Sequence, residues 1–298
     1  MKTDKPLVSI CIPTYNGELF IEECLTSAIH QTYDNLEIIV SDDASSDNTL
    51  SIVNTLKQNT DIPIHVFNHK PSGIGANWNN CVKHAKGDYI KFLFQDDMLY
   101  PNCIETLMAL MASETNVGMV YAKRKFIYKE KTESISQFED FYGDLHLHWS
   151  EIEVIQGVLD GRQYLKDKSF LNAPKNKIGE PTSVLLSKQC FEKVGYFRQD
   201  LKQALDCEFW YRLMPFYKIG FVDEVLSSFR LHDAQASAIN KSKKINETET
   251  LYNIYYNSLL PYLHILCRRK LQKRFHPIIS RLYKLKVVLR GLITFNKE

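Results

Sequence analysis

The chain has 298 residues, of which 44% are hydrophobic and 24% charged, and its formal net charge at pH 7 is +2. This composition is typical of a globular protein with a substantial core, and the near-neutral balance gives no electrostatic reason to expect a nucleic-acid partner. The seven cysteines are scattered, odd in number and without a CxxC pair. That pattern argues against a zinc site or a disulfide framework and suits a reducing compartment.

The hydrophobic segments are too short for targeting or membrane insertion. The first apolar run covers only residues 7–12, and no later run approaches the roughly 20 apolar residues that span a bilayer. We therefore expect a cytoplasmic location for the main body of the chain.

Strand and helix patterns alternate through about residue 100. Runs of β-branched and apolar residues predict strands, and apolar stripes at helical spacing predict helices between them. The predicted strands are 7–12, 36–40, 64–67 and 89–94, and the predicted helices are 19–28, 50–57 and 76–85. This order predicts an α/β fold with a mostly parallel sheet, right-handed crossovers and helices on both faces.

The pattern is less regular in the second half. Residues 101–178 show no clear periodicity, 179–186 read as a loop that leads into a strand, and 188–194 read as a short helix. Residues 204–214 then predict a longer helix, and 221–226 and 228–231 are strand-like.

Polar side chains gather just after three predicted strands: Tyr15 after the first, Asp42 and Asp43 after the second, and Asp96 and Asp97 after the fourth. In open α/β sheets, ligands bind outside the carboxyl ends of the strands. This convergence predicts a binding site at that edge.

Each of these groups has a structural alternative. The adjacent carboxylates Asp96 and Asp97 suit a divalent cation bridged to diphosphate oxygens, or they are a helix N-cap pair. Asp42 and Asp43 could accept hydrogen bonds from a nucleobase or ribose, or could close an Asx-turn. Tyr15 could stack on a base or simply pack.

Two later residues could also carry chemistry. Asp206 lies on a predicted helix with largely apolar neighbours, so it could act as a general base if it faces the cleft, or it is a solvated helical carboxylate. His232 follows a strand-like run and is either a ligand or a structural histidine.

The C-terminal segment is strongly basic. Residues 261–298 contain ten lysines and arginines against one acidic residue, Glu298, and apolar residues are interleaved among them. This is the composition of a basic amphipathic helix that lies on an anionic membrane surface; the alternative is a helix that packs on the domain with a solvated basic face. No nucleic-acid-binding motif accompanies the basic run.

Taken together, the segments resemble the family 2 inverting glycosyltransferases of the GT-A (Rossmann-like) fold, from about Pro6 to Ser237. The resemblance is carried by motifs in the family's order, namely 8–18, 37–49, 87–97, 179–183, 193–198, 204–213 and 229–233. It implies transfer of a sugar from a nucleotide-diphosphate donor, with UDP favoured and dTDP and GDP open.

The resemblance also implies roles for individual residues. Pro13, Thr14, Tyr15 and Glu18 would line the pocket for the base and ribose, Asp43 would bind the base, and Asp96 would touch the ribose or the metal. Asp97 would ligate Mn²⁺ or Mg²⁺, His232 would bind the metal or the diphosphate, and Asp206 would deprotonate the acceptor hydroxyl.

Three positions depart from the family pattern. Phe94 stands where an acidic residue is common, Trp78 stands where an arginine often approaches the diphosphate, and Leu205 stands where a glutamate often precedes the base. The change at Trp78 shifts the charge burden onto the metal, and Leu205 predicts a raised pKa for Asp206.

We thus expect a GT-A domain over 1–240, with a nucleotide-binding half (1–100) and an acceptor-side half (101–240), and a basic amphipathic helical tail over 241–298. The expected acceptor is a glycan or lipid-linked glycan, as in surface polysaccharide synthesis, and the tail predicts peripheral association with the inner face of the membrane. The alternatives are a non-catalytic sugar-nucleotide-binding partner in a glycan assembly complex, or a nucleotidyltransferase; the latter is disfavoured because no glycine-rich basic loop follows the first strand.

Overall fold

The computed structural model describes residues 5–232, 235, 240, 242–283 and 285. Its strands, in chain order, are β1 (Val8–Thr14), β2 (Leu36–Asp42), β3 (Ile64–Asn68), β4 (Tyr89–Phe92), β5 (Met98–Leu99), β6 (Val117–Ile127), β7 (Gly157–Asp160), β8 (Val184–Ser187) and β9 (Lys218–Arg230). They form one sheet in the order β3-β2-β1-β4-β8-β6-β9-β5, with β7 paired to β9.

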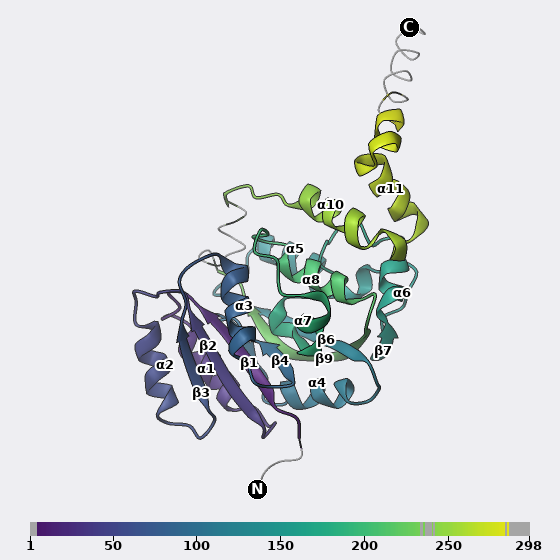
Figure 1. The fold of residues 1–298 in the computed structure, drawn as a ribbon. Coiled ribbons are helices and arrows are strands. Elements are labelled where there is room, and N and C mark those ends of the chain that lie inside the picture. The colour runs from purple at the N-terminus through teal and green to yellow at the C-terminus, as the bar shows by residue number, and fades with distance from the viewer. Residues whose placement is uncertain (1–4, 233–234, 236–239, 241, 284, 286–298) are drawn as a thin grey trace.

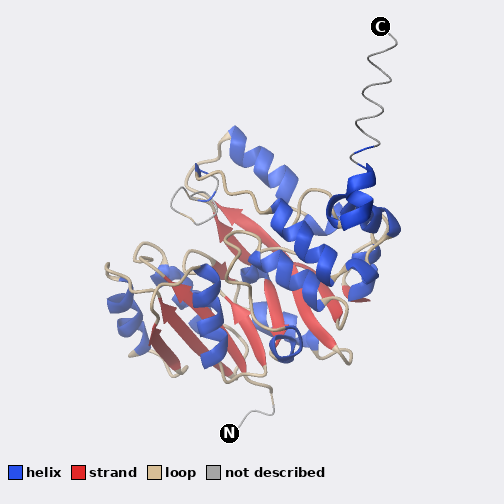
Figure 2. Cartoon of the chain, turned by 45° about the horizontal axis from the view of Figure 1, so that its top comes forward, coloured by secondary structure: helices blue, strands red, loops and turns tan. Residues whose placement is uncertain are grey.

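Helices cover both faces of this sheet (Figures 1 and 2). They are α1 (Ile21–Ile29), α2 (Thr49–Lys57), α3 (Ile74–His84), α4 (Cys103–Met111), α5 (Glu133–Tyr142), α6 (Gly161–Lys166), α7 (Gln189–Val194), α8 (Leu205–Leu213), α10 (Thr248–Ser258) and α11 (Ile265–Phe275), with 3₁₀ turns η1 (Leu145–His148), η2 (Pro181–Ser183) and η3 (Leu260–Tyr262). The predicted α/β class is confirmed.

The period-2 alternation of the strands divides the core into two clusters. Ile10 and Ile12 of β1 pack with buried residues of α1, α2 and α4, whereas Cys11 between them packs on the opposite face with residues of α3, α7 and α8. Both faces of β1 and β2 are apolar because helices cover both, as expected for buried parallel strands.

Strand direction decides which chain ends meet at the site. The strands β3, β2, β1 and β4 are parallel, β8 is antiparallel to both β4 and β6, and β6 is parallel to β9. The strands β1, β2, β4 and β9 therefore end at one edge, while β8 begins there. This reversal brings η2 to the same edge as Tyr15, Asp43 and Asp96.

The irregular region 101–178 contains a strand that the sequence pattern missed. The strand β6 runs over eleven residues and pairs along most of its length with β9, which is one long strand rather than two short ones. Register shifts between Val117 and Met119 and between Ala122 and Arg124 break the period-2 pattern, which explains the missed prediction.

Much of the predicted tail packs on the main core. Leu251, Tyr252 and Tyr255 of α10 and Cys267 and Leu271 of α11 are buried in the same cluster as α8. A further helical stretch covers 277–283, and the ribbon projects away from the body beyond α11 (Figure 1). The basic residues Lys284, Lys286, Arg290 and Lys297 lie outside the described residues. Among the described residues, none of the helices combines the length and the hydrophobicity that a bilayer span requires.

Candidate active site

A cleft of about 500 Å³ opens at the sheet edge where β1, β2, β4 and β9 end and β8 begins. Residues from both halves of the chain line it. They are Pro13, Thr14, Tyr15, Asp43, Pro71, Gly73, Ile74, Asn77, Trp78, Phe94, Gln95, Asp96, Glu180, Pro181, Lys202, Gln203, Leu205, Asp206, Phe229, His232, Gln235 and Asn240. Of the sequence-predicted site residues, Glu18 and Asp97 are not in this set.

The loop after β1 presents an exposed aromatic ring on a fixed backbone. Tyr15 is 57% exposed, yet its backbone N–H donates to Gln95 Oε1 (2.8 Å) and its carbonyl accepts from Gln95 Nε2 (3.0 Å). These two hydrogen bonds fasten the β1 loop to the loop after β4. The ring is thus held ready at the mouth of the cleft.

The two aspartates after β2 have different environments. Asp42 is buried, and its carboxylate accepts hydrogen bonds from the Thr14 hydroxyl (2.9 Å) and from the backbone N–H (2.8 Å) and hydroxyl (2.6 Å) of Ser45. The turn alternative therefore holds for Asp42. Asp43 lines the cleft and pairs with Nδ1 of His69, a partner that the sequence did not indicate.

Glu18 lies elsewhere than expected. Its carboxylate accepts from the backbone N–H (3.0 Å) and side-chain amide (2.9 Å) of Asn48, while its own N–H donates to Asp47 (3.0 Å). Glu18 thus ties the first loop to the second rather than lining the cleft, because its place just before α1 directs it toward the start of α2.

Asp96 and His232 form a close pair at the cleft. Nε2 of His232 lies 2.9 Å from Oδ2 of Asp96, although 136 positions separate them in the sequence. Arg230 holds the two segments together: its Nε donates to the Asp96 carbonyl (2.8 Å), and its guanidinium pairs with Glu23 (2.6 Å). Oδ2 of Asp96 and Nε2 of His232 therefore lie side by side at the cleft.

Asp97 is instead buried behind this pair, at 1% exposure. Oδ2 accepts from the Thr182 hydroxyl (2.6 Å) and Oδ1 accepts from the Arg230 backbone N–H (3.0 Å). Burial, then the neighbouring charge of Asp96, raises the pKa of Asp97 well above its usual range. Both oxygens accept hydrogen bonds from protein groups, and the metal-ligand role expected for Asp97 stays a prediction. Met98–Leu99 form β5, so an N-cap role for the pair is absent.

Asp206 lies at the first turn of α8 and faces the same cleft. The Asn176 amide donates to Oδ2 (2.8 Å), and the Cys207 backbone N–H donates to Oδ1 (2.6 Å). Burial, opposed by the Cys207 hydrogen bond and reinforced by the charge of Glu180, raises the pKa of Asp206 to about 7. A carboxyl group with this pKa can accept a proton near neutral pH.

Several cleft residues were not singled out from the sequence as site residues. Glu180 forms a two-point ion pair with the buried guanidinium of Arg124 (2.7 and 3.3 Å), which also donates to the Gly143 carbonyl (2.8 Å). Lys202 is the only lysine or arginine among the described residues of the lining. The motif at 179–183 was a signal for Glu180, but Arg124 lies in the region without periodicity.

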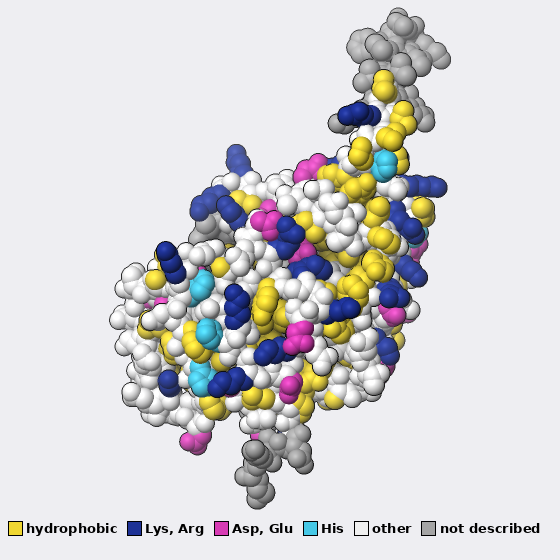
Figure 3. All heavy atoms as spheres, in the orientation of Figure 1, with side chains coloured by type: hydrophobic (Ala, Val, Ile, Leu, Met, Phe, Trp, Pro, Cys, Tyr) yellow, Lys and Arg dark blue, Asp and Glu magenta, His cyan; other side chains and the backbone are white. Residues whose placement is uncertain are grey.

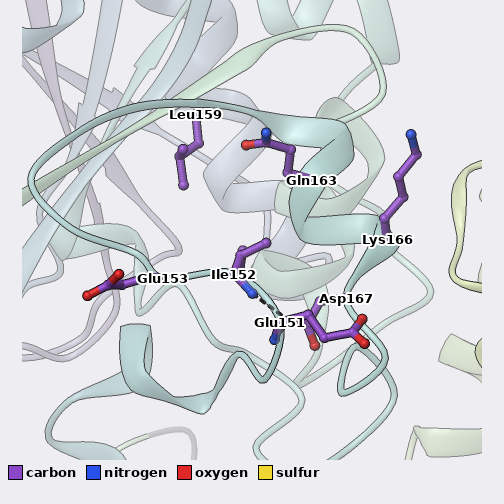
Figure 4. A pocket seen from close by; sticks show the side chains of 7 residues that line it. All are labelled: Glu151, Ile152, Glu153, Leu159, Gln163, Lys166 and Asp167. Atoms are coloured by element: carbon purple, nitrogen blue, oxygen red, sulfur yellow. Dashed lines mark hydrogen bonds between the residues drawn. The ribbon is translucent and has the colours of Figure 1, made fainter.

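A second hollow has a structural explanation. It is lined by residues between 151 and 167, and Figure 4 shows Asp167 beside the backbone of Glu151 and Ile152. Burial raises the pKa of Asp167, but hydrogen bonds from Ser169 and from neighbouring backbone amides outweigh this effect and lower it to about 2. Its carboxylate therefore holds the loop at residues 150–152 in place, which is a structural role.

Comparisons with known proteins identify the family and the fold of the chain. Residues 9–193 match the sequence profile described as Glycosyl transferase family 2. An uncharacterized glycosyltransferase of Rickettsia typhi is 29% identical over 261 residues, which cover 86% of this chain and 74% of that protein.

Two solved structures share the fold. The S. aureus TarS 1-349 structure in complex with UDP-GlcNAc has a TM-score of 0.61 at 18% identity, covering 90% of this chain and 71% of that one. The mannosyltransferase PcManGT from Pyrobaculum calidifontis, in complex with GDP-Man and Mn²⁺, has a TM-score of 0.61 at 17% identity, covering 96% and 81%.

Proposed function

This chain belongs to glycosyl transferase family 2 and is an enzyme of glycosyl transfer; from that premise we propose that it is a metal-dependent, inverting enzyme that takes its sugar from a nucleotide-diphosphate donor, UDP-linked in the first instance. One observation carries the proposal. The Asp96–His232 pair and Asp206, whose pKa is raised to about 7, line a single cleft.

We assign the nucleotide to the end of the cleft near β1 and β2. The exposed ring of Tyr15 can stack on a base, because every base offers a π-face. The Asp43 carboxylate, oriented by His69, can accept a hydrogen bond from the base or ribose. Pro13 and Thr14 line the same end. The solved relatives in complex with UDP-GlcNAc and GDP-Man support a sugar nucleotide as ligand.

We assign the metal to Asp96 and His232. The two side chains offer two ligand atoms, a carboxylate oxygen and an imidazole nitrogen. That number fits Mg²⁺ or Mn²⁺, which typically combine one or two protein ligands with substrate phosphates and water. The bound cation would neutralise the charge that develops on the departing diphosphate. Asp97 then supports the pair without touching the ion.

We assign the proton transfer to Asp206. In its ionised form it would accept the proton of the acceptor hydroxyl as that oxygen attacks the anomeric carbon. The Asn176 amide and the Cys207 N–H fix both oxygens, so the carboxylate holds one orientation. A single displacement from the face opposite the leaving group inverts the anomeric configuration.

The acceptor is proposed to be a glycan or lipid-linked glycan at an anionic membrane surface. Beyond the buried Cys267 and Leu271, the helices from 265 to 283 expose Ile265, Leu266, Ile278, Leu282 and Tyr283 among basic residues. Figure 3 shows lysine, arginine and hydrophobic side chains mixed along this projecting part. Such a surface suits the boundary between lipid headgroups and acyl chains.

The test is a calorimetric panel of UDP, dTDP and GDP, each with and without Mn²⁺, on the wild type and on Asp96→Ala and His232→Ala. We expect one nucleotide to bind tightly only with the metal, and both variants to lose this metal-dependent gain at an unchanged melting temperature. Asp34→Asn, at an exposed carboxylate that pairs with Lys5, is the matched control. Metal-dependent binding that survives both substitutions would contradict the site.

A further inference from the structure

The centre of the cleft has an apolar surface that the proposed chemistry does not use. Trp78 and Phe94 both line the cleft, with ring centroids 4.9 Å apart. Phe197 packs edge-on against Trp78 at 5.2 Å and fixes it from behind. Pro181 and Leu205 extend the same lining. We call Trp78, Phe94, Pro181 and Leu205 the aromatic floor.

The floor lies between the nucleotide end of the cleft and Asp206. The Phe94 backbone N–H donates to the Thr182 hydroxyl (3.3 Å), and the next residue, Gln95, bonds the backbone of Tyr15, so Phe94 lies between η2 and the β1 loop. Phe94 precedes Asp96 by two residues, and Leu205 immediately precedes Asp206. The floor therefore extends from the residues that would hold the diphosphate to the residue that would take the proton.

In a sugar nucleotide the anomeric carbon is bonded directly to the diphosphate, so the sugar ring would lie between a diphosphate held near Asp96 and the carboxylate of Asp206. A hydroxyl group pressed on Phe94, Pro181 or Leu205 would leave water without gaining a partner, because the indole N–H of Trp78 is the one hydrogen-bonding side-chain group of the floor. A methyl group would instead gain contact with the two rings. The polar side chain of Gln203 lines the cleft as well and can bind another hydroxyl of the sugar.

We infer that the donor sugar presents a methyl group to the aromatic floor, either the methyl of a 6-deoxyhexose or that of an acetamido group. This inference rests on the proposed function, because it assumes that a sugar nucleotide occupies the cleft. It adds that Phe94 and Trp78, two of the three positions that depart from the family pattern, act together as specificity-determining residues.

The test compares donors that share one base, chosen as the nucleoside diphosphate that binds most tightly. For the gluco, galacto and manno series, calorimetry with Mn²⁺ compares the nucleotide-linked hexose, its 6-deoxy form and its 2-acetamido form. The variants are Phe94→Leu, which keeps an apolar side chain, and Phe94→Asn, which does not. The nucleoside diphosphate alone is the control ligand for every protein.

We expect one methyl-bearing form to bind the wild type about 10- to 100-fold more tightly than its parent hexose, the usual range for a pocket that selects one apolar group. The 6-deoxy and acetamido arms identify which methyl it is. Phe94→Leu should keep most of the preference and Phe94→Asn should lose it, while both bind the nucleoside diphosphate as the wild type does.

A parent hexose that binds the wild type as tightly as its methyl-bearing forms in all three series would overturn the inference, and so would a preference that survives Phe94→Asn. If Phe94→Asn does not fold, the wild-type comparison decides alone. Failure of the wild type to bind any nucleoside diphosphate would overturn the proposed function and this inference together; binding without discrimination overturns only the inference.

Discussion

Replacing Asp206 by asparagine tests the proposed base and its environment at once. The amide cannot take a proton from an acceptor hydroxyl, so we expect transfer to fall by about 100-fold or more while donor affinity stays near the wild-type value. In the wild type, kcat/KM should rise with pH and level off above about pH 7, since the base acts only when ionised.

The same substitution should change stability in a pH-dependent way. The folded protein holds the Asp206 proton more tightly than the unfolded chain, where the ordinary pKa is 3.8. The contribution to stability is therefore full below about pH 4 and is lost as the pH rises through about 7, a loss on the order of 4 kcal/mol. As the pH rises from 5 to 8, the free energy of unfolding of the variant should increase by about 3 kcal/mol relative to that of the wild type.

The relative stability of the variant must be compared at two pH values, because the asparagine amide also disturbs a hydrogen bond. Its NH₂ group would face the amide of Asn176, which now donates to Oδ2, and losing that bond costs about 1–2 kcal/mol. That cost is nearly independent of pH, so urea unfolding at pH 5 and pH 8 isolates the titration.

The matched control is Asp34→Asn, at an exposed carboxylate paired with Lys5. It should change neither transfer nor the pH dependence of unfolding. Retained transfer in Asp206→Asn would remove Asp206 from the mechanism. A stability difference between that variant and the wild type that does not change with pH would refute the argument from burial.

Three further predictions concern support of the cleft. Asp97→Ala leaves the Thr182 hydroxyl and the Arg230 N–H without their acceptor, so urea unfolding should show a loss of about 2–4 kcal/mol; an unchanged stability would contradict the supporting role. Glu247→Ala removes the carboxylate that accepts from the backbone N–H groups of Lys202, Gln203 and Ala204. We expect a clear fall in the rate of transfer, measured by kinetics, and only a small fall in the melting temperature. Deleting 277–298 should weaken sedimentation with anionic vesicles and preserve transfer to a soluble acceptor; undiminished sedimentation would exclude residues 277–298 from the membrane contact.

The first hundred residues were largely predictable because their strands are regular and buried on both faces. The predicted strand 36–40 lies within β2 (Leu36–Asp42), and the predicted strand 64–67 lies within β3 (Ile64–Asn68). The strand β6 escaped because its register shifts interrupt the alternation on which such predictions depend. In helix α10 the buried Leu251 and Tyr255 are surrounded in the sequence by mainly polar residues. Its packing on the main core was therefore also not predicted.

The sequence by itself determined that polar residues follow the strands of an α/β sheet and that Asp96, Asp206 and His232 are candidates for one site. Only the tertiary structure decided which member of each aspartate pair faces the cleft. Adjacent residues at a strand end point in different directions, and the partner that buries one of them comes from far along the chain: Thr182 takes Asp97 because β8 runs antiparallel to β4 and begins at this edge. Strand direction is a property of the assembled sheet, and no local pattern encodes it.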